Sequence, residues 1–303
     1  NAEKFVNDIN PALVLWIKYE YWLNHLAVLK KKEIPVLLIS GHFRSSQPFF
    51  KWYGNMWRAT LAGFEHIFVQ HHSSLELLHQ IKLKTKASVS GDTRFDRVAE
   101  IALTPLSIPE IERFSSNHKV IVAGSTWPED EMMLNKFIHR YPQYKLIVVP
   151  HDVNEKRKAA LRSVFPSAIL FSACKDSENL IAPIMIVDTI GLLSTIYRYA
   201  TLTYIGGGFD KGIHNTLEAA VYGKPIVFGP VYQKFREAVE MIDMGCAYSI
   251  NNENDFFAVV EKMDSDESLL QKAGEIAKTY VSAHTGATAQ ILNYIKSNLL
   301  LTR

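Results

Sequence analysis

Short apolar segments and longer amphipathic segments alternate along almost the whole chain. The apolar segments are rich in Val, Ile and Leu, often on consecutive positions rather than on alternate ones. Consecutive apolar residues are typical of strands that are buried on both faces of a parallel sheet. The pattern predicts strands at residues 13–17, 36–39, 66–69, 120–123, 145–149, 168–171, 184–187, 202–205, 225–228 and 247–250.

The amphipathic segments between these strands have the residue spacing of helices. Residues 19–31 carry large apolar side chains on one helical face, and three other segments show similar spacing: 131–140, 254–263 and 287–301. Strands that alternate with helices predict βαβ units with right-handed crossovers. The predicted fold class is therefore α/β, with doubly wound parallel sheets.

A boundary between two domains is predicted close to residue 110. The segment from residue 102 to residue 118 contains Pro105, Pro109 and a Ser-Ser-Asn run, which favour a linker, and 303 residues fit two domains. We expect one Rossmann-like domain at residues 1–110 and a second at residues 111–303. The final amphipathic helix is expected to return to the first domain.

The first domain is expected to be incomplete. Only three or four strands are predicted before the boundary, too few for a well-covered sheet, and the chain opens at Asn1 without an initiator methionine or a signal peptide. We therefore expect that an upstream segment of the natural protein precedes these residues.

Composition and charge exclude several classes of protein. Hydrophobic residues make up 48% and charged residues 21%, which is typical of a globular protein and not of a disordered or fibrous one. The chain has 33 Lys and Arg residues and 31 Asp and Glu residues, so it lacks the excess of positive charge that would predict nucleic-acid binding. No apolar run approaches the roughly 18 residues of a membrane span. Cys174 and Cys246 have no motif spacing, which favours two buried thiols in a reducing compartment.

The loops that follow the predicted strands are the places to look for chemistry, because ligands of open α/β sheets bind beyond the carboxyl ends of the strands. After the strand at 120–123, Ser125 or Thr126 is placed to cap a helix, and free N–H groups there would hold a phosphate. The simpler alternative is an ordinary helix cap. After the strand at 145–149, His151 is either a ligand contact or a surface histidine.

A third loop follows the strand at 184–187. Asp188 and Thr189 are predicted to cap a helix there, and Gly191 would let the backbone approach a ligand such as an aromatic base. A helix cap without a ligand remains the alternative.

The strongest candidate is the loop that follows the strand at 202–205. Three glycines at 206–208 allow a close approach to a ligand, and a helix is expected to begin near His214. Glu218 lies four residues after His214 and three after Asn215, so these side chains would share one helical face. A helix N-terminus for phosphate, followed by a carboxylate for two ribose hydroxyls, is typical of nucleotide-sugar sites. The loop does not fit the dinucleotide fingerprint, which belongs in a first βα unit.

Other candidates are weaker. His71 and His72 are adjacent and cannot face the same way on a regular element, so no metal site is predicted there. No nucleophile elbow is present. The lysines at 30–32, 82, 84 and 86 are expected to be solvated, with weak docking on anionic lipid as the alternative.

The fourth loop carries a family resemblance. Residues 212–230 read Gly-Ile-His-Asn-Thr-Leu-Glu-Ala-Ala-Val-Tyr-Gly-Lys-Pro-Ile-Val-Phe-Gly-Pro, which resembles a hallmark of the bacterial 3-deoxy-D-manno-octulosonic acid (Kdo) transferases of lipopolysaccharide assembly. Similar matches occur in order at 19–24, 90–96, 124–126 and 187–191, so the resemblance runs from about residue 9 to residue 240.

The resemblance implies a GT-B fold, in which two Rossmann-like domains face a cleft. It implies an inverting transfer of Kdo from CMP-Kdo to lipid A precursor (lipid IVA), without a metal or other cofactor and without nucleic acid. The reaction would take place at the cytoplasmic face of the inner membrane, where an N-terminal anchor would hold the enzyme.

The resemblance also implies roles for particular residues. Ser125 and Thr126 would face phosphate, and Asn215 and Glu218 would hold phosphate and ribose. Arg94 in the first domain is a candidate contact to the Kdo carboxylate or to an acceptor phosphate. The complete set of expected donor-binding residues is Ser125, Thr126, His151, Ile190, Gly191, Gly207, Gly208, Lys211, His214, Asn215 and Glu218.

Two departures from the family pattern matter. Where the family usually has Pro-Arg-His-Pro-Glu-Arg, this chain has Pro-His-Asp-Val-Asn-Glu at 150–155, without the arginine.

The family's general base is a glutamate in a Gly-Glu segment near the front of the first domain, and we expect it to lie upstream of Asn1. Glu20 occupies a different family position and is not assigned as the base, so the catalytic residue is unknown. We expect the 303 residues to bind CMP and to turn over negligibly alone.

Two alternatives stay open at this point. One is another GT-B enzyme that uses a UDP-sugar, either a transferase or a 2-epimerase. The other is a nucleotide-binding module that is not catalytic.

Overall fold

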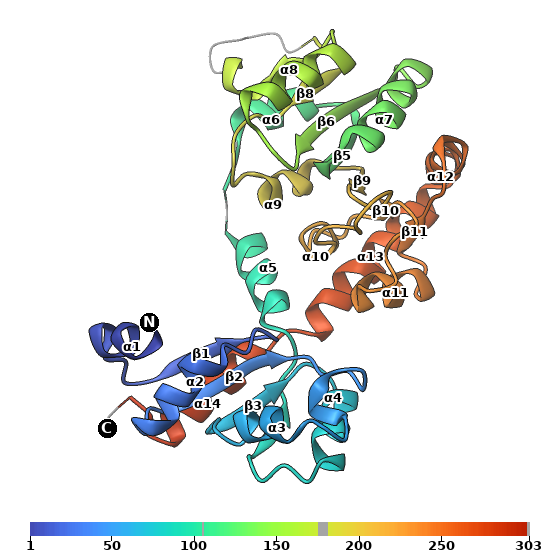
Figure 1. Ribbon diagram of the computed structural model, residues 1–303. Coiled ribbons are helices and arrows are strands. Elements are labelled where there is room, and N and C mark those ends of the chain that lie inside the picture. Colours follow the sequence, from blue (N-terminus) through green and yellow to red (C-terminus); the bar gives the residue numbers. More distant parts are fainter. Residues whose placement is uncertain (105, 175–180, 302–303) are drawn as a thin grey trace. The chain divides into compact units, whose positions relative to one another are not determined.

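The computed structural model describes residues 1–104, 106–174 and 181–301, and contacts divide the chain into two units (Figure 1). Unit 1 comprises residues 1–97 and 284–303, and unit 2 comprises residues 98–283. The division falls inside helix α5 (Thr93–Leu103), earlier than the boundary predicted at residue 110. Pro109 begins helix α6 (Pro109–Ser115) within unit 2, whereas Pro105 lies outside the described residues.

Unit 1 contains a four-stranded parallel sheet in the order β1-β2-β3-β4. The strand β4 was not predicted, because its three residues include only two apolar ones around Ser88. The strands are β1 (Val14–Ile17), β2 (Val36–Gly41), β3 (His66–Val69) and β4 (Ala87–Val89). Helix α1 (Ala2–Ile9) precedes β1, and the helices between the strands are α2 (Leu23–Lys31), η1 (Pro48–Phe50), α3 (Asn55–Leu61) and α4 (His72–Gln80).

The two central strands of unit 1, β2 and β3, are buried on both faces, as their consecutive apolar residues predicted. The edge strand β1 differs from this prediction, because Leu15 and Ile17 on one of its faces are exposed. Successive side chains of a strand point to opposite faces of the sheet. On one face, Leu38 packs in a hydrophobic cluster with residues of helices α2 and α3. On the other face, Leu37 and Ile39 belong to a second hydrophobic cluster. In that second cluster, Ile291 and Ile295 of helix α14 (Ala287–Ser297) pack on β2 and β3. The last helix of the chain therefore completes the core of unit 1.

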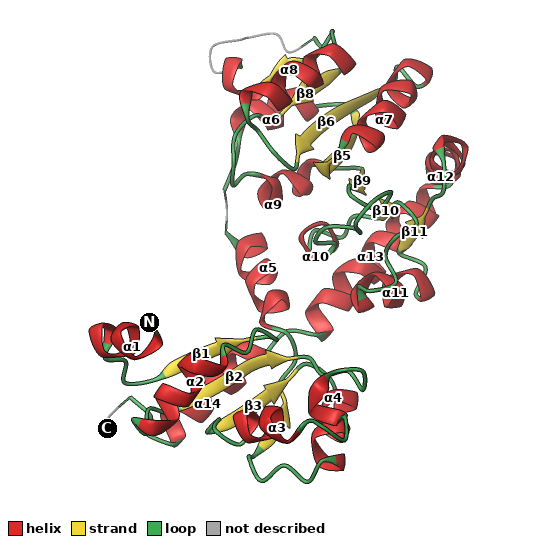
Figure 2. Ribbon diagram, viewed as in Figure 1, coloured by secondary structure: helices red, strands yellow, loops and turns green. Residues whose placement is uncertain are grey.

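Unit 2 contains a seven-stranded parallel sheet in the order β11-β10-β9-β5-β6-β8-β7, with helices on its faces (Figure 2). All the strands predicted for this part are present. They are β5 (Lys119–Thr126), β6 (Tyr144–Pro150), β7 (Ile169–Leu170), β8 (Ile184–Ile186), β9 (Leu202–Ile205), β10 (Ile226–Phe228) and β11 (Ala247–Ser249). The helices that follow α6 are α7 (Pro128–Arg140), α8 (Glu155–Val164), η2 (Phe171–Ala173), α9 (Leu193–Ile196), η3 (Tyr197–Tyr199), α10 (Leu217–Ala220), α11 (Arg236–Asp243), α12 (Glu253–Ser265) and α13 (Glu267–Ala283).

The strand order of unit 2 reverses next to β5. From β5 the chain forms β6, then the edge strand β7, and then β8 between them on one side, before it crosses to β9, β10 and β11 on the other. The carboxyl ends of β5 and β9 are therefore neighbours at a topological switch point, which is where open α/β sheets bind ligands.

The core of unit 2 fixes this arrangement. Phe137 of α7 and Phe256 of α12 pack against Ile121 and Tyr204 of the central strands, and all four are fully buried. In the part of the chain that the model describes, no helix combines the length and the apolar character needed to span a membrane.

Candidate functional site

The buried carboxylate of Asp130 joins the two loops at the switch point. Its Oδ2 atom accepts hydrogen bonds from the backbone N–H of Trp127 (2.9 Å) and of Gly207 (3.0 Å), and its Oδ1 atom accepts from the Tyr204 hydroxyl (2.6 Å). Asp130 is only 1% exposed. Burial raises the pKa of its carboxyl, and the three hydrogen bonds act in the opposite direction.

The cap of helix α7 differs from the expectation. Ser125 or Thr126 was predicted to cap this helix, but Trp127 occupies the N-cap position and Pro128 begins the helix. Asp130 takes the role of capping carboxylate, because its side chain accepts from the Trp127 backbone. The prediction of a cap by Ser125 or Thr126 is therefore wrong.

Thr126 and Ser125 lie at the end of β5 and differ in their surroundings. Thr126 is 1% exposed, and its hydroxyl donates to Glu131 Oε1 (2.7 Å), a carboxylate that also pairs with Arg157. Ser125 is half-buried and has a φ of 53°, a left-handed conformation that is uncommon outside glycine. Contact of either residue with a phosphate stays a prediction.

The glycines after β9 allow backbone segments to touch. A Cβ atom at Gly206 would lie 2.3 Å from the Ser125 carbonyl oxygen, and one at Gly208 would lie 2.6 Å from the Gly229 backbone nitrogen. Gly207 has a φ of 89°. The switch point is thus packed backbone to backbone, which brings the loops after β5, β9 and β10 together.

An alanine at Gly208 is expected to destabilise unit 2 by about 3 kcal/mol, because its Cβ would push the end of β9 away from Gly229. Urea unfolding measures the loss. At Gly245, a Cβ would meet nothing within 4 Å and only the φ of 82° is unfavourable, so Gly245→Ala is expected to cost about 1 kcal/mol. Equal losses for the two variants would contradict the packing explanation.

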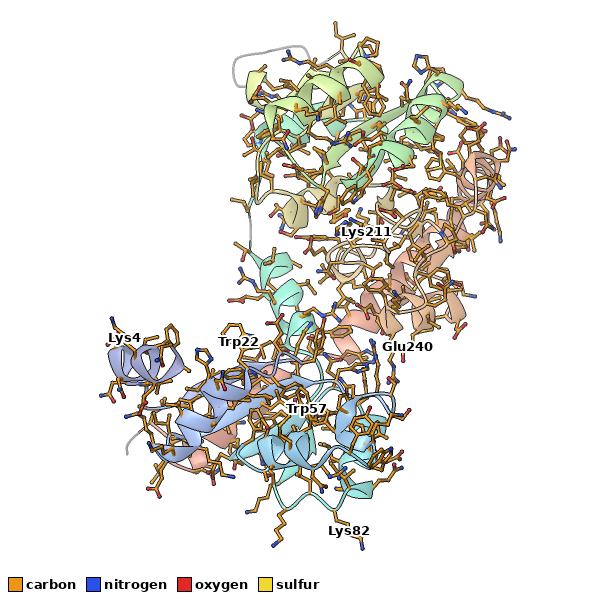
Figure 3. All side chains as sticks on the ribbon, viewed as in Figure 1. Lys4, Trp22, Trp57, Lys82, Lys211 and Glu240 are labelled. Atoms are coloured by element: carbon orange, nitrogen blue, oxygen red, sulfur yellow. The ribbon has the colours of Figure 1, made fainter. Side chains whose placement is uncertain are left out.

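Three aromatic rings from different loops stack at this edge of the sheet. The His151 ring lies 4.5 Å from the His214 ring and 4.9 Å from the Trp127 ring, as distances between centroids. The indole N–H of Trp127 donates to His214 Nε2 (3.1 Å). Lys211, labelled in Figure 3, places its Nζ atom 5.9 Å from the centre of the Trp127 ring. These rings and the ammonium group form a cationic, aromatic platform.

Glu218 and Asn215 are in contact, as their spacing predicted. The Asn215 amide donates to Glu218 Oε1 (2.9 Å), and its Oδ1 atom accepts from the backbone N–H of Leu217 (3.2 Å). Burial raises the pKa of Glu218, and the hydrogen bond from Asn215 opposes this. The helix begins at Leu217 rather than near His214, so that expectation is wrong. The positive φ of Gly212 and the turn closed by Asn215 keep residues 212–216 out of the helix.

The loop after β8 holds Ile190 and Gly191. Ile190 is 82% exposed, and Gly191 has a φ of 90°. Asp188 was predicted to cap a helix, but it accepts hydrogen bonds from the backbone N–H (3.0 Å) and the hydroxyl (2.7 Å) of Ser172, and α9 begins only at Leu193. That prediction is wrong. Contacts of Ile190 and Gly191 with a nucleotide base stay predictions.

Arg94 belongs to unit 1. Its backbone N–H (2.9 Å) and its Nε atom (2.8 Å) donate to the buried carboxylate of Asp92, which also accepts from Gln70 (2.9 Å) and lies 3.6 Å from the Lys18 ammonium. Asp92 therefore orients the guanidinium of Arg94. A contact of Arg94 with Kdo or an acceptor stays a prediction.

Sequence reasoning missed two residues of the site, Trp127 and Asp130. In the sequence, Asp130 is one of three consecutive acids in a first turn, where acids ordinarily complement the helix dipole. The signal available was the Trp-Pro pair directly after a buried strand, which places a large side chain at the loop edge. Among the described residues, no group of three or more His, Cys, Asp and Glu side chains is arranged to hold a metal ion.

Comparison with solved structures defines the class of fold. The model is similar to a putative UDP-N-acetylglucosamine 2-epimerase of Listeria monocytogenes, with a TM-score of 0.67, 15% identity and coverage of 98% of this chain and 77% of that one. It is equally similar to the MnaA–UDP structure from S. aureus, with a TM-score of 0.67, 16% identity and coverage of 100% and 80%. The protein has a GT-B fold built from two Rossmann-like α/β units.

Comparison of sequences shows similarity to one family of transferases. Residues 1–97 match the family model of 3-deoxy-D-manno-octulosonic-acid transferase (kdotransferase). Relatives named 3-deoxy-D-manno-octulosonic acid transferase are 25% identical in Rickettsia typhi, over 97% of this chain and 65% of the relative, and 25% identical in Chlamydia muridarum, over 91% and 66%. The chain therefore resembles Kdo transferases over most of its length, and its first 97 residues match their family model. It spans about two thirds of the length of these two relatives.

Proposed function

We propose that this protein acts in the inverting transfer of Kdo from CMP-Kdo to lipid A precursor (lipid IVA). The proposal rests on the occurrence, in one chain, of the match to the Kdo transferase family model and of the site at the carboxyl ends of β5 and β9. The relatives are named 3-deoxy-D-manno-octulosonic acid transferase. The site offers a carboxylate and a cationic, aromatic platform, which suit a ribose and a phosphate.

The nucleotide would bind at the carboxyl ends of β5 and β9. Glu218, held by Asn215, is suited to accept hydrogen bonds from the ribose hydroxyls, because an ionised carboxylate is acceptor-only. The cytidine would lie toward Ile190 and Gly191, and the phosphate would lie toward Lys211 and His214. Arg94 would meet the Kdo carboxylate or an acceptor phosphate.

The reaction requires CMP to leave as an anion while a sugar hydroxyl of the lipid attacks the anomeric carbon from the opposite face. The attacking hydroxyl loses its proton, and the electron pair of the broken C–O bond goes to the phosphate oxygen. Lys211 and the imidazole of His214 would stabilise that charge, an electrostatic contribution of about 3 kcal/mol when donors are preorganised. We assign none of these side chains as the general base.

The proposal includes the place of the reaction. A lipid acceptor confines it to a membrane surface, which we propose to be the cytoplasmic face of the inner membrane. The enzyme would use CMP-Kdo and lipid A precursor as its partners, without nucleic acid.

Titration calorimetry with CMP and with UDP tests the choice of donor. We expect the chain to bind CMP at least tenfold more tightly than UDP, which corresponds to about 1.4 kcal/mol. Glucose 6-phosphate serves as a control for general phosphate binding. A preference for UDP would contradict the proposal and favour a UDP-sugar enzyme of the same fold.

A further inference from the structure

The hydrogen bond between Trp127 and His214 fixes where His214 carries its proton. The indole Nε1–H is a donor only, and it lies 3.1 Å from His214 Nε2. His214 Nε2 must therefore present a lone pair, so the imidazole is neutral and its single proton is on Nδ1. In the opposite tautomer, two N–H groups would face each other at this distance.

We propose that Trp127 is a positioning residue, which holds His214 as the Nδ1–H tautomer so that this N–H donates to a phosphate oxygen of the bound nucleotide. The proposal rests on the proposed function for the identity of the ligand, a nucleoside monophosphate group. The predicted tautomer of His214 does not depend on which ligand binds.

The tautomer decides the sign of the interaction with an anion. With the proton on Nδ1, that side of the ring is a hydrogen-bond donor, which a phosphate oxygen can accept. With the proton on Nε2, Nδ1 would present a lone pair to the phosphate and repel it. By holding the proton of His214 on Nδ1, Trp127 makes that nitrogen a hydrogen-bond donor instead of an acceptor. Trp127 itself does not contact the ligand.

The groups around His214 keep its ring neutral. His151 from the loop after β6 stacks on it, Lys211 from its own loop lies beside Trp127, and the buried carboxylate of Asp130 is occupied by Trp127, Gly207 and Tyr204. Burial, with the charge of His151 as the smaller cause, lowers the pKa of His214. The hydrogen bond from Trp127 acts in the same direction, because it stabilises the neutral ring.

The test compares the chain with its Trp127→Phe variant, which keeps an aromatic ring for stacking and removes the N–H donor. Long-range proton–nitrogen NMR spectra of the 15N-histidine-labelled chain report the tautomer, and His214→Asn assigns the signals. We expect the Nδ1–H tautomer in the wild type and a shift toward Nε2–H in Trp127→Phe, together with a higher pKa of His214. Trp52→Phe, at an exposed tryptophan of unit 1, is the control and should change neither.

Calorimetry with CMP completes the test. We expect Trp127→Phe to weaken CMP binding about tenfold while Trp52→Phe leaves it unchanged, because one hydrogen bond to a charged group is lost. A wild-type His214 in the Nε2–H tautomer would overturn the inference, and so would CMP binding that is equal in Trp127→Phe and the wild type. If the wild type does not bind CMP at all, the proposed function fails, while the NMR result still decides the tautomer.

Discussion

Replacing Glu218 with alanine is expected to weaken CMP binding about 100-fold, because two hydrogen bonds from the ribose to a carboxylate are lost at about 1.5 kcal/mol each. Glu218→Gln keeps the shape and an oxygen for Asn215 but removes the charge, so we expect a loss of about tenfold. Calorimetry at pH 7.5 measures both losses. The two variants together separate the charge of Glu218 from its volume.

Glu275→Ala is the matched control, because Glu275 is exposed on helix α13 of the same unit. It should bind CMP like the wild type. If Glu218→Ala also did so, the nucleotide site would lie elsewhere. Kdo transfer measured in the catalytically active protein adds a second readout, since transfer unchanged by Glu218→Ala would favour a nucleotide-binding module that is not catalytic.

Asp130→Ala is expected to lower the free energy of unfolding of unit 2 by about 4 kcal/mol, because it leaves three hydrogen-bond donors, two of them in buried hydrogen bonds, without an acceptor. Asp130→Asn retains one oxygen and is expected to lose about half as much. Amide hydrogen exchange of β5 and β9 measures the change within unit 2, independently of unit 1.

The surface variant Asp243→Ala provides the reference, because Asp243 is an exposed residue of helix α11 in the same unit. Its effect should stay within about 0.5 kcal/mol. A loss of under about 1 kcal/mol for Asp130→Ala would contradict the view that this carboxylate holds the two loops together.

The sequence predicted the fold where the physical signal is local. Runs such as the one at 146–149 are apolar on consecutive positions, and such a run is stable only between two covered faces, so the buried strands were found. Ala87–Val89 was missed because three residues with a central serine have no such signature. The boundary predicted near residue 110 depended on prolines, which mark both linkers and the first turns of helices, and Pro109 is of the second kind.

The site was predictable only in part for the same reason. Asn215 and Glu218 are three residues apart, so their contact followed from the sequence. The stack of Trp127, His151 and His214 joins three loops that are far apart in the chain, and no local pattern contains it. Asp130 looked like any acid in a first turn, because the sequence does not show that Gly207 and Tyr204 arrive beside it.

Helix α14 has a consequence for how the protein is made. Unit 2 is one uninterrupted stretch of chain, whereas unit 1 is discontinuous and takes Ile291, Ile295 and Leu300 into its core. During synthesis the second unit can therefore fold before the first, although the first emerges earlier from the ribosome. A premature stop codon between residues 284 and 287 would spare unit 2 and leave one face of the first sheet uncovered.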